Sequence, residues 1–428
     1  MLHRAAALAA LWYCLPVAVA PARAEPPADA VAPAIEFPVA VERALAARPE
    51  FRRFVVQREA QAARREQALL RPPLELGAEL ENVLGTGDVS GFKQAELTVG
   101  LGSTYERGGK RAARVAVAEE ALGAIGADER LAVLEVGAET ARRFVGLAAA
   151  QERSALAERL AMQAQEVVDL VTPRVRAAQS PKSELLNAQI RLADALLAQG
   201  DARRAIAAAQ ARLGEQWADP DAQPRVAMEF YRLPHNVDAA ALDPLLEQMP
   251  DIARFASEQR VREAEIRLAQ AQSTPDWGWF AGVRRLEGID DQALVLGFSV
   301  PLGSAQRALP FVAESRANLA LIDGEREAAL LRLRTLLRTE LTVLESARAA
   351  EHAIRDHQLP QAREASQLTL AAYRVGRYPY RELALAQQQV IEFERRRLDA
   401  AIAYHLARVE LERLIGSTLP TAPEPAAH

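Results

Sequence analysis

Acidic side chains alternate with apolar ones along two short segments, and their spacing is the feature of the sequence most open to a chemical role. Glu75, Glu79 and Glu81 occupy alternate positions of the first segment, and Glu96 opens the second. Successive side chains of a strand point to opposite faces, so these carboxylates share one face of a strand pair. Carboxylates on a pore wall attract cations, whereas on an exposed strand they only maintain solubility. The sequence leaves both interpretations open.

No other set of residues predicts catalysis or a tightly held metal ion. His352 and His357 are five residues apart, a poor spacing for two ligands on one helix face, so we expect them to be solvated. The Gly-x-Gly triplets at 85–87 and 100–102 lack the strand-then-helix setting of a nucleotide-binding loop. The only cysteine, Cys14, lies in a leader segment, so the mature chain has no thiolate. We therefore expect no enzymatic activity, no cofactor and no bound metal.

The first 24 residues have the pattern of an export signal. Arg4 precedes an apolar run, and residues 22–24 form a small-residue cleavage site. We do not expect lipid attachment at Cys14, because two bulky aromatic residues precede it. Loss of Arg4 and Arg23 leaves 50 basic against 57 acidic residues, a net charge of −7. This charge, with arginine clusters interspersed among glutamates, predicts no nucleic-acid partner.

The acidic residues belong to a hairpin pattern that occurs twice, at 74–102 and at 276–301. Each strand has about the 9–11 residues of a tilted membrane-spanning strand, with one apolar face. On that interpretation the membrane-facing residues are Leu76, Leu80, Leu97, Trp277, Trp279, Leu296 and Phe298. An ordinary antiparallel hairpin has the same two faces, and packed tryptophans would give the same pattern.

Each hairpin is followed by an Ala-rich helical pattern of unusual length. The first runs without a proline over residues 109–172, which at about 1.5 Å per residue predicts a helix of about 95 Å. The second runs from about 310 to 372. Turns near 174–183 and 374–381 then reverse the chain into further helices. Only coiled-coil-like assemblies and tunnel walls use helices of this length.

Landmarks around these elements recur at a nearly constant offset, which predicts two internal repeats. The offset is 201 residues for the first two pairs and 198 for the last. The pairs are Pro49 to Phe54 with Pro250 to Phe255, Leu101-Gly102-Ser103 with Leu302-Gly303-Ser304, and Pro181 with Pro379. The predicted domains are a signal peptide at 1–24, a first repeat at 25–213, a linker at 214–249, a second repeat at 250–416 and a disordered tail at 417–428.

The fold class expected from these elements is mostly α with four β-strands. Four strands cannot close a membrane barrel, which needs about eight, so a membrane-spanning form requires several copies of the chain to pool their strands. Three copies would supply twelve strands and twelve long helices that wall a tube. The alternative of another class is a periplasmic coiled-coil scaffold without a pore.

Three segments resemble the TolC-like outer-membrane channels of tripartite export systems. They are residues 91–122, with the motif GGKRAAR, residues 282–302, with GVRRLEG and LGFSVPL, and residues 372–416. The similarity is to the branch that serves heavy-metal pumps of the resistance-nodulation-division (RND) type, the CzcC-like proteins. It implies a homotrimer in the outer membrane of a Gram-negative bacterium, with a twelve-stranded barrel and a long α-helical barrel in the periplasm. The implied partners are a periplasmic adaptor protein, an inner-membrane RND pump and outer-membrane lipid.

The resemblance also implies that the two helical turns form a periplasmic tip that opens against the adaptor. Tyr373, Gly376 and Glu382 match the family pattern at the second turn, and we expect charge reversal of Glu382 to loosen the tip. The other expected tip residues are Arg377, Arg176 and Glu184. The implied function is passive conduction of heavy-metal cations, with a duct for drugs or organic solutes as the alternative.

Overall fold

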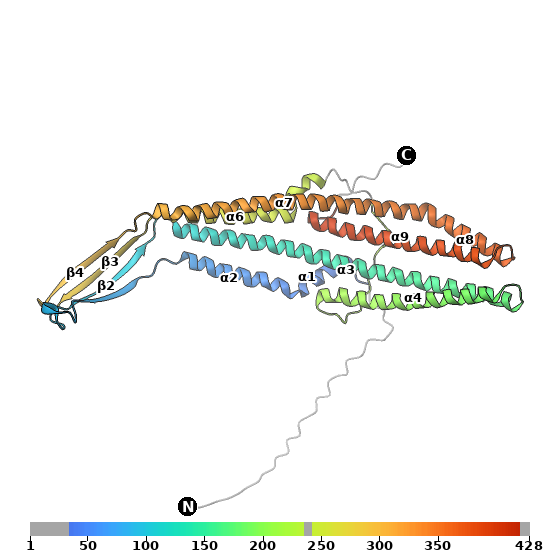
Figure 1. Cartoon of the computed structure of the whole chain (residues 1–428), viewed down its shortest axis with the longest axis horizontal. Helices are drawn as coiled ribbons and strands as arrows, with labels where there is room; N and C mark the ends of the chain where they lie inside the picture. The colour runs from blue at the N-terminus through green and yellow to red at the C-terminus, as the bar shows by residue number, and fades with distance from the viewer. Residues whose placement is uncertain (1–33, 235–241, 420–428) are drawn as a thin grey trace, which may run out of the picture.

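The protein is a long rod of helices with a small β-sheet at one end and two helical turns at the other (Figure 1). This computed structural model describes residues 34–234 and 242–419. The predicted signal peptide lies outside the described residues, as do parts of the predicted linker and tail. The four strands and the predominance of helix agree with the fold class predicted from the sequence.

The two predicted hairpins join into one antiparallel sheet with the order β1-β2-β3-β4. The strands are β1 (Glu75–Glu81), β2 (Glu96–Tyr105), β3 (Trp277–Leu286) and β4 (Asp291–Ser299). The central strands β2 and β3 come from different halves of the chain and pair over their full lengths. β1 and β4 form the two edges of the sheet.

Two helical lines run the length of the rod, and shorter helices pack along each half (Figure 1). The first line is α3, whose 67 residues extend about 100 Å. The second line is α7 followed by α8. The helices are α1 (Phe37–Ala47), α2 (Arg52–Leu69), α3 (Lys110–Arg176), α4 (Lys182–Gly214), α6 (Pro250–Ala271), α7 (Ser304–Ala353), α8 (Leu359–Arg374) and α9 (Tyr380–Ile415).

The second long helix differs from the prediction in two respects. It begins at Ser304 rather than near Pro310, which lies inside α7. It is also interrupted by a π-helical turn at Ile354–Gln358, immediately before Pro360. Proline has no N–H to continue the helical ladder, and a π-turn is one way in which a helix accommodates that loss.

Among the predicted repeat landmarks, the Arg-Phe pairs fall on equivalent helices of the two halves, whereas the Leu-Gly-Ser triplets do not fall on equivalent elements. Near the start of α2 and of α6, Arg53 stacks on the buried Phe54, and Arg254 stacks in the same way on the buried Phe255. Leu101-Gly102-Ser103, however, lies inside β2, whereas Leu302-Gly303-Ser304 leads into α7, so this pairing was wrong. The equivalent glycines are Gly109 and Gly303, which precede the long helices in the left-handed conformation at φ 73° and 79°.

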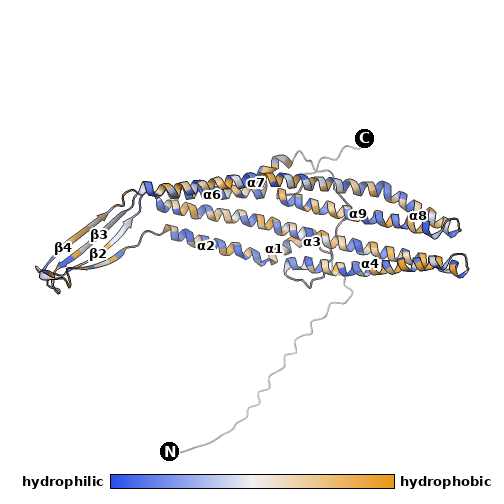
Figure 2. Cartoon of the chain, viewed as in Figure 1, coloured by the Kyte–Doolittle hydropathy of each residue, from blue (hydrophilic) through white to orange (hydrophobic). Residues whose placement is uncertain are grey.

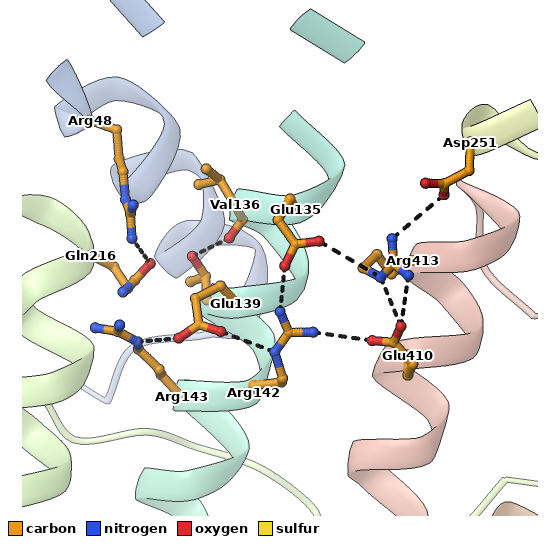
Figure 3. Close-up of polar contacts among 11 residues, drawn as sticks. Arg48, Glu135, Val136, Glu139, Arg142, Arg143, Gln216, Asp251, Glu410 and Arg413 are labelled. Carbon is orange, nitrogen blue, oxygen red and sulfur yellow. Dashed lines mark hydrogen bonds and ion pairs between the residues drawn. The ribbon is translucent and has the colours of Figure 1, made fainter. Parts of the chain in front are cut away.

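A network of ion pairs joins helices from both halves near the middle of the rod (Figure 3). Arg142 of α3 contacts Glu135 at 2.7 Å, Glu139 at 3.0 Å and Glu410 of α9 at 3.2 Å. Arg413 of α9 lies 2.8 Å from Glu410 and 3.6 Å from Asp251 of α6. Burial opposes ionisation of these arginines, but the surrounding carboxylates raise the pKa of Arg142 and Arg413 further. The network fixes the register of α3, α6 and α9.

Hydrophobic and hydrophilic residues alternate along the helices and do not form long apolar runs (Figure 2). Within residues 34–234 and 242–419, no helix is long and apolar enough to cross a membrane.

Part of the predicted linker is anchored to α9 by two buried side chains. The Tyr404 hydroxyl donates to the carbonyl of Pro234 at 2.9 Å, and Nε2 of His405 lies 2.8 Å from the carbonyl of Phe230. Because a carbonyl only accepts, Nε2 must carry the proton. Burial lowers the pKa of His405, so the ring is held neutral.

We predict that the protein loses stability as the pH falls below about 6.5, because an unfolded chain then binds a proton that the folded His405 resists. His405→Gln keeps an N–H donor and removes the titration. Its melting temperature should therefore fall less between pH 7 and pH 5 than that of the wild type. His357→Gln, at an exposed position, is the control. Equal pH dependence in the wild type and His405→Gln would contradict the prediction.

Candidate functional site

The sheet has one continuous apolar face. Residues opposite each other in antiparallel strands point to the same side, so the rows Leu76-Leu101-Ala281-Leu296 and Ala78-Val99-Val283-Leu294 share a face. All seven predicted membrane-facing residues lie on it: Leu76, Leu80, Leu97, Trp277, Trp279, Leu296 and Phe298. Their exposure in the single chain ranges from 37% for Trp277 to 75% for Leu76. The chain itself therefore leaves this face largely uncovered.

The four predicted lumen carboxylates lie together on the opposite face. Arg284 of β3 reaches two of them, Glu81 at 2.8 Å and Glu96 at 2.7 Å, and its Nε donates to the Thr98 hydroxyl at 2.8 Å. No such pair is formed by Glu75 or Glu79 among the described residues. The negative charge of this face is thus partly neutralised, and only at the end of the sheet where Glu81 and Glu96 lie.

Arg285, the next residue along β3, does not contribute to that neutralisation. It is opposite Leu97 and Gln292, on the apolar face, and pairs with Glu287 and Asp290 beside the β3–β4 turn. Adjacent residues of a strand point to opposite sides, so only one of two neighbouring arginines can reach the acidic face.

An aromatic ring also lies on the acidic face, and sequence reasoning missed it. A Cβ added to Gly100 would lie 2.6 Å from Cζ of Phe280, and one added to Gly102 would lie 3.4 Å from its Cδ2. Gly77 and Gly297 border the same ring. The Phe280 ring therefore lies against the backbone of these glycines. Glycines at alternate positions of several strands were the available sequence signal.

A partly buried ion pair connects the sheet to the helices at their junction. Lys110 lies 2.7 Å from Asp276, whose other oxygen accepts the Arg107 backbone N–H at 3.0 Å. Burial raises the pKa of Asp276, but these two hydrogen bonds outweigh it and hold the pKa below its usual range. Glu106 pairs with Arg114 in the same way. The segment 103–107 thus connects the end of β2 to α3 and to the residue that precedes β3.

The two helical turns at the far end have the same backbone design. After α3, the Gln179 N–H bonds to the Arg174 carbonyl at 2.8 Å, and after α8 the Arg377 N–H bonds to the Ala372 carbonyl at 2.9 Å. Each turn needs one left-handed residue, which is Gly376 at φ 74° in the second turn and Ala178 at φ 55° in the first. The turns therefore end their helices by the same helix-capping motif.

Tyr373 joins the two helical hairpins at this tip. Its side chain is 1% exposed, and its hydroxyl donates to Glu184 at 3.1 Å. The Arg174 guanidinium lies 4.9 Å from the ring centroid, and Arg174 also donates to the Arg374 carbonyl at 3.0 Å. Burial is the main cause of the raised pKa of Tyr373, so its hydroxyl stays protonated at neutral pH.

The other predicted tip residues are not part of this contact. Arg176 and Arg377 are exposed, and Glu382 forms an ion pair with the neighbouring Arg381 at 3.2 Å. Arg174 was missed, although a basic residue in the last helical turn, two residues before Arg176, was visible in the sequence. Within the described part of the chain, no cluster of three or more His, Cys, Asp or Glu residues could hold a metal ion.

Tyr373→Phe should loosen the tip, because it removes a hydrogen bond to a carboxylate worth about 1–2 kcal/mol. We expect roughly tenfold faster amide hydrogen exchange in the turns at 177–181 and 375–379. Tyr378→Phe, at an exposed position, is the matched control. Charge reversal of Glu382 should have a smaller effect than Glu184→Gln. If Tyr373→Phe exchanges at the wild-type rate, the hydroxyl does not hold the hairpins together.

Comparisons with known proteins agree with this architecture. A family model described as outer membrane efflux protein matches residues 40–218. No curated protein matches the chain. Among solved structures, a membrane protein from Pseudomonas aeruginosa is 18% identical, with 92% of each chain covered and a TM-score of 0.74.

Two further structures share the fold at low identity. The first is CusC, whose crystal structures concern folding and transmembrane channel formation. It is 15% identical to this chain, the match covers 89% of this chain and 92% of CusC, and the TM-score is 0.73. The outer membrane protein VceC from Vibrio cholerae is 16% identical, with 89% and 96% covered and a TM-score of 0.70. Residues 40–218 thus match the outer membrane efflux protein family, and the chain as a whole has the TolC-like fold.

Proposed function

We propose that the protein is an outer-membrane efflux channel, assembled as a homotrimer and working with a periplasmic adaptor and an inner-membrane RND pump. The observation that carries this proposal is the four-stranded sheet, with one exposed apolar face and one acidic face, at the end of helices about 100 Å long. Three such sheets, joined edge to edge, would close a twelve-stranded barrel with lipid outside and water inside.

The chain would conduct passively, and the partner pump would supply the energy. The helical tip would meet the adaptor, and opening would separate the two hairpins that Tyr373, Glu184 and Arg174 hold together. Gly376, Arg377, Arg176 and Glu382 would contribute to the same tip surface. This role needs no catalytic residue and no cofactor.

The cargo we propose is heavy-metal cations. The acidic face supports a cation path, since Glu75, Glu79, Glu81 and Glu96 outnumber the one guanidinium among them. The alternative cargo is drugs or organic solutes, and the observation that favours it is the Phe280 ring on the same face. A coiled-coil scaffold without a pore would not need the exposed apolar face.

Single-channel conductance of the purified protein in planar bilayers tests the proposal. We expect discrete steps and, in a salt gradient, a reversal potential that favours cations. Arg284→Gln should increase the cation preference, because it leaves Glu81 and Glu96 unneutralised on the lumen face. Arg285→Gln, the adjacent arginine on the other face, is the matched control and should leave selectivity unchanged.

The outcomes separate the claims. Conductance steps without cation preference would support a channel but would contradict a cation-selective acidic lumen. Equal effects of the two arginine variants would reject the assignment of faces. A protein that stays soluble without detergent and forms no channels would favour the scaffold.

Leu296→Asp should impair membrane assembly, because a charge on the lipid face costs up to a few kcal/mol, depending on its depth. Leu296 is 73% exposed on the apolar face of the edge strand β4. The yield of detergent-extracted trimer measures the effect, with Ala293→Asp, on the acidic face of β4, as the control. Normal trimer yield from Leu296→Asp would show that this face does not meet lipid.

A further inference from the structure

Four arginines lie close to the points where the chain passes between the sheet and the helices. Arg71 precedes β1, Arg107 follows β2, Arg111 lies in the first turn of α3 and Arg307 in the first turn of α7. We call this set the arginine collar. The nearby carboxylates Glu106 and Asp276 are already paired with Arg114 and Lys110. Within residues 34–234 and 242–419, none of the four collar guanidinium groups forms an ion pair.

One member of the collar, Arg107, borders an aromatic cluster on the apolar face of the sheet. The Trp277 ring lies 6.4 Å from the Tyr105 ring and 5.7 Å from the Phe298 ring, measured between centroids. Aromatic residues of this kind gather where a membrane barrel passes from hydrocarbon to headgroups. The cluster lies at the ends of the strands nearest the helices, so it marks one boundary of the apolar face.

Arg107 links the collar to this cluster. Its guanidinium carbon lies 4.1 Å from the Trp277 ring centroid, and its backbone N–H is held by Asp276. Stacking on a ring uses the face of the guanidinium and leaves its N–H groups, which lie in its plane, free to donate. The side chain is therefore positioned at the edge of an apolar face, and no carboxylate of the described residues pairs with its N–H groups.

We propose that Arg107, stacked on Trp277, binds the phosphate of a phospholipid headgroup in the inner leaflet of the outer membrane, with the rest of the collar providing a positive surface. The inference rests on the proposed membrane position of the sheet. A planar guanidinium binds phosphate oxygens in pairs, and the adjoining apolar face accepts the acyl chains. Because Arg107 and Trp277 adjoin the central strands β2 and β3, a neighbouring copy paired at β1 or β4 leaves them accessible to lipid.

Native mass spectrometry of the delipidated trimer, titrated with phosphatidylglycerol, tests the proposal. The wild type should retain about one lipid per chain, and Arg107→Gln should bind it roughly fivefold more weakly or worse. Arg107→Lys keeps the charge and should retain part of the affinity. Arg316→Gln, an exposed arginine about 13 Å further along α7 from Arg307, is the matched control and should bind as the wild type does.

Two further ligands identify the group that is bound. Diacylglycerol, which has the same acyl chains and no phosphate, should bind weakly, and inorganic phosphate should not displace the lipid at equal concentration. Equal binding of diacylglycerol, or displacement by inorganic phosphate, would overturn the proposal. If Arg107→Gln does not assemble, Arg111→Gln combined with Arg307→Gln should weaken lipid binding instead, since both side chains are exposed.

Conductance separates this inference from the proposed function. A wild-type protein that forms channels but retains no phosphatidylglycerol would overturn the lipid site and leave the channel. Failure to form channels at all would overturn the proposed function itself.

Discussion

The main constraint on this architecture is that its four-stranded sheet has two open edges. β1 and β4 have no further strand partner among the described residues, and the apolar face between them is exposed. In the proposed membrane position, no water could satisfy the backbone groups of an edge strand, so other strands would have to complete the sheet. On that proposal the single chain supplies one part of a barrel wall, and further copies of the chain supply the rest.

The helices are subject to a different constraint. A helix as long as α3 is stable only when other helices pack against it along its length. α3 packs against helices from both halves of the chain, and the middle of the rod combines a hydrophobic core with the ion-pair network around Arg142 and Arg413. At the sheet end Asp276 pairs with Lys110, and at the tip the Tyr373 hydroxyl bonds to Glu184 beside a second, smaller hydrophobic cluster. The middle of the rod thus holds the helices together, while the two ends carry the surfaces that we propose for lipid and for the adaptor.

Repetition in the sequence does not make the two halves equivalent in their contacts at the tip. Glu184 and Glu382 both lie in the first turn of a helix that follows a proline, and both complement its dipole. Only Glu184 meets Tyr373, because the position that corresponds to Tyr373 in the first half is Val175. Similarly, Gly376 occupies the left-handed position of one turn without strain, whereas Ala178 occupies it in the other at a steric cost.

The sequence alone determined the strands, the long helices and the two faces of the sheet, because periods of two and 3.6 residues are local properties. It also placed the acids on one face and the leucines on the other. Tertiary structure alone decided that the two hairpins share one sheet, that Arg284 rather than Arg285 reaches the acids, and that Phe280 lies over glycines. It also brought Arg174 to Tyr373 and Arg107 to Trp277. These pairs are 170 or more residues apart, and only the packing of the two halves sets their distance.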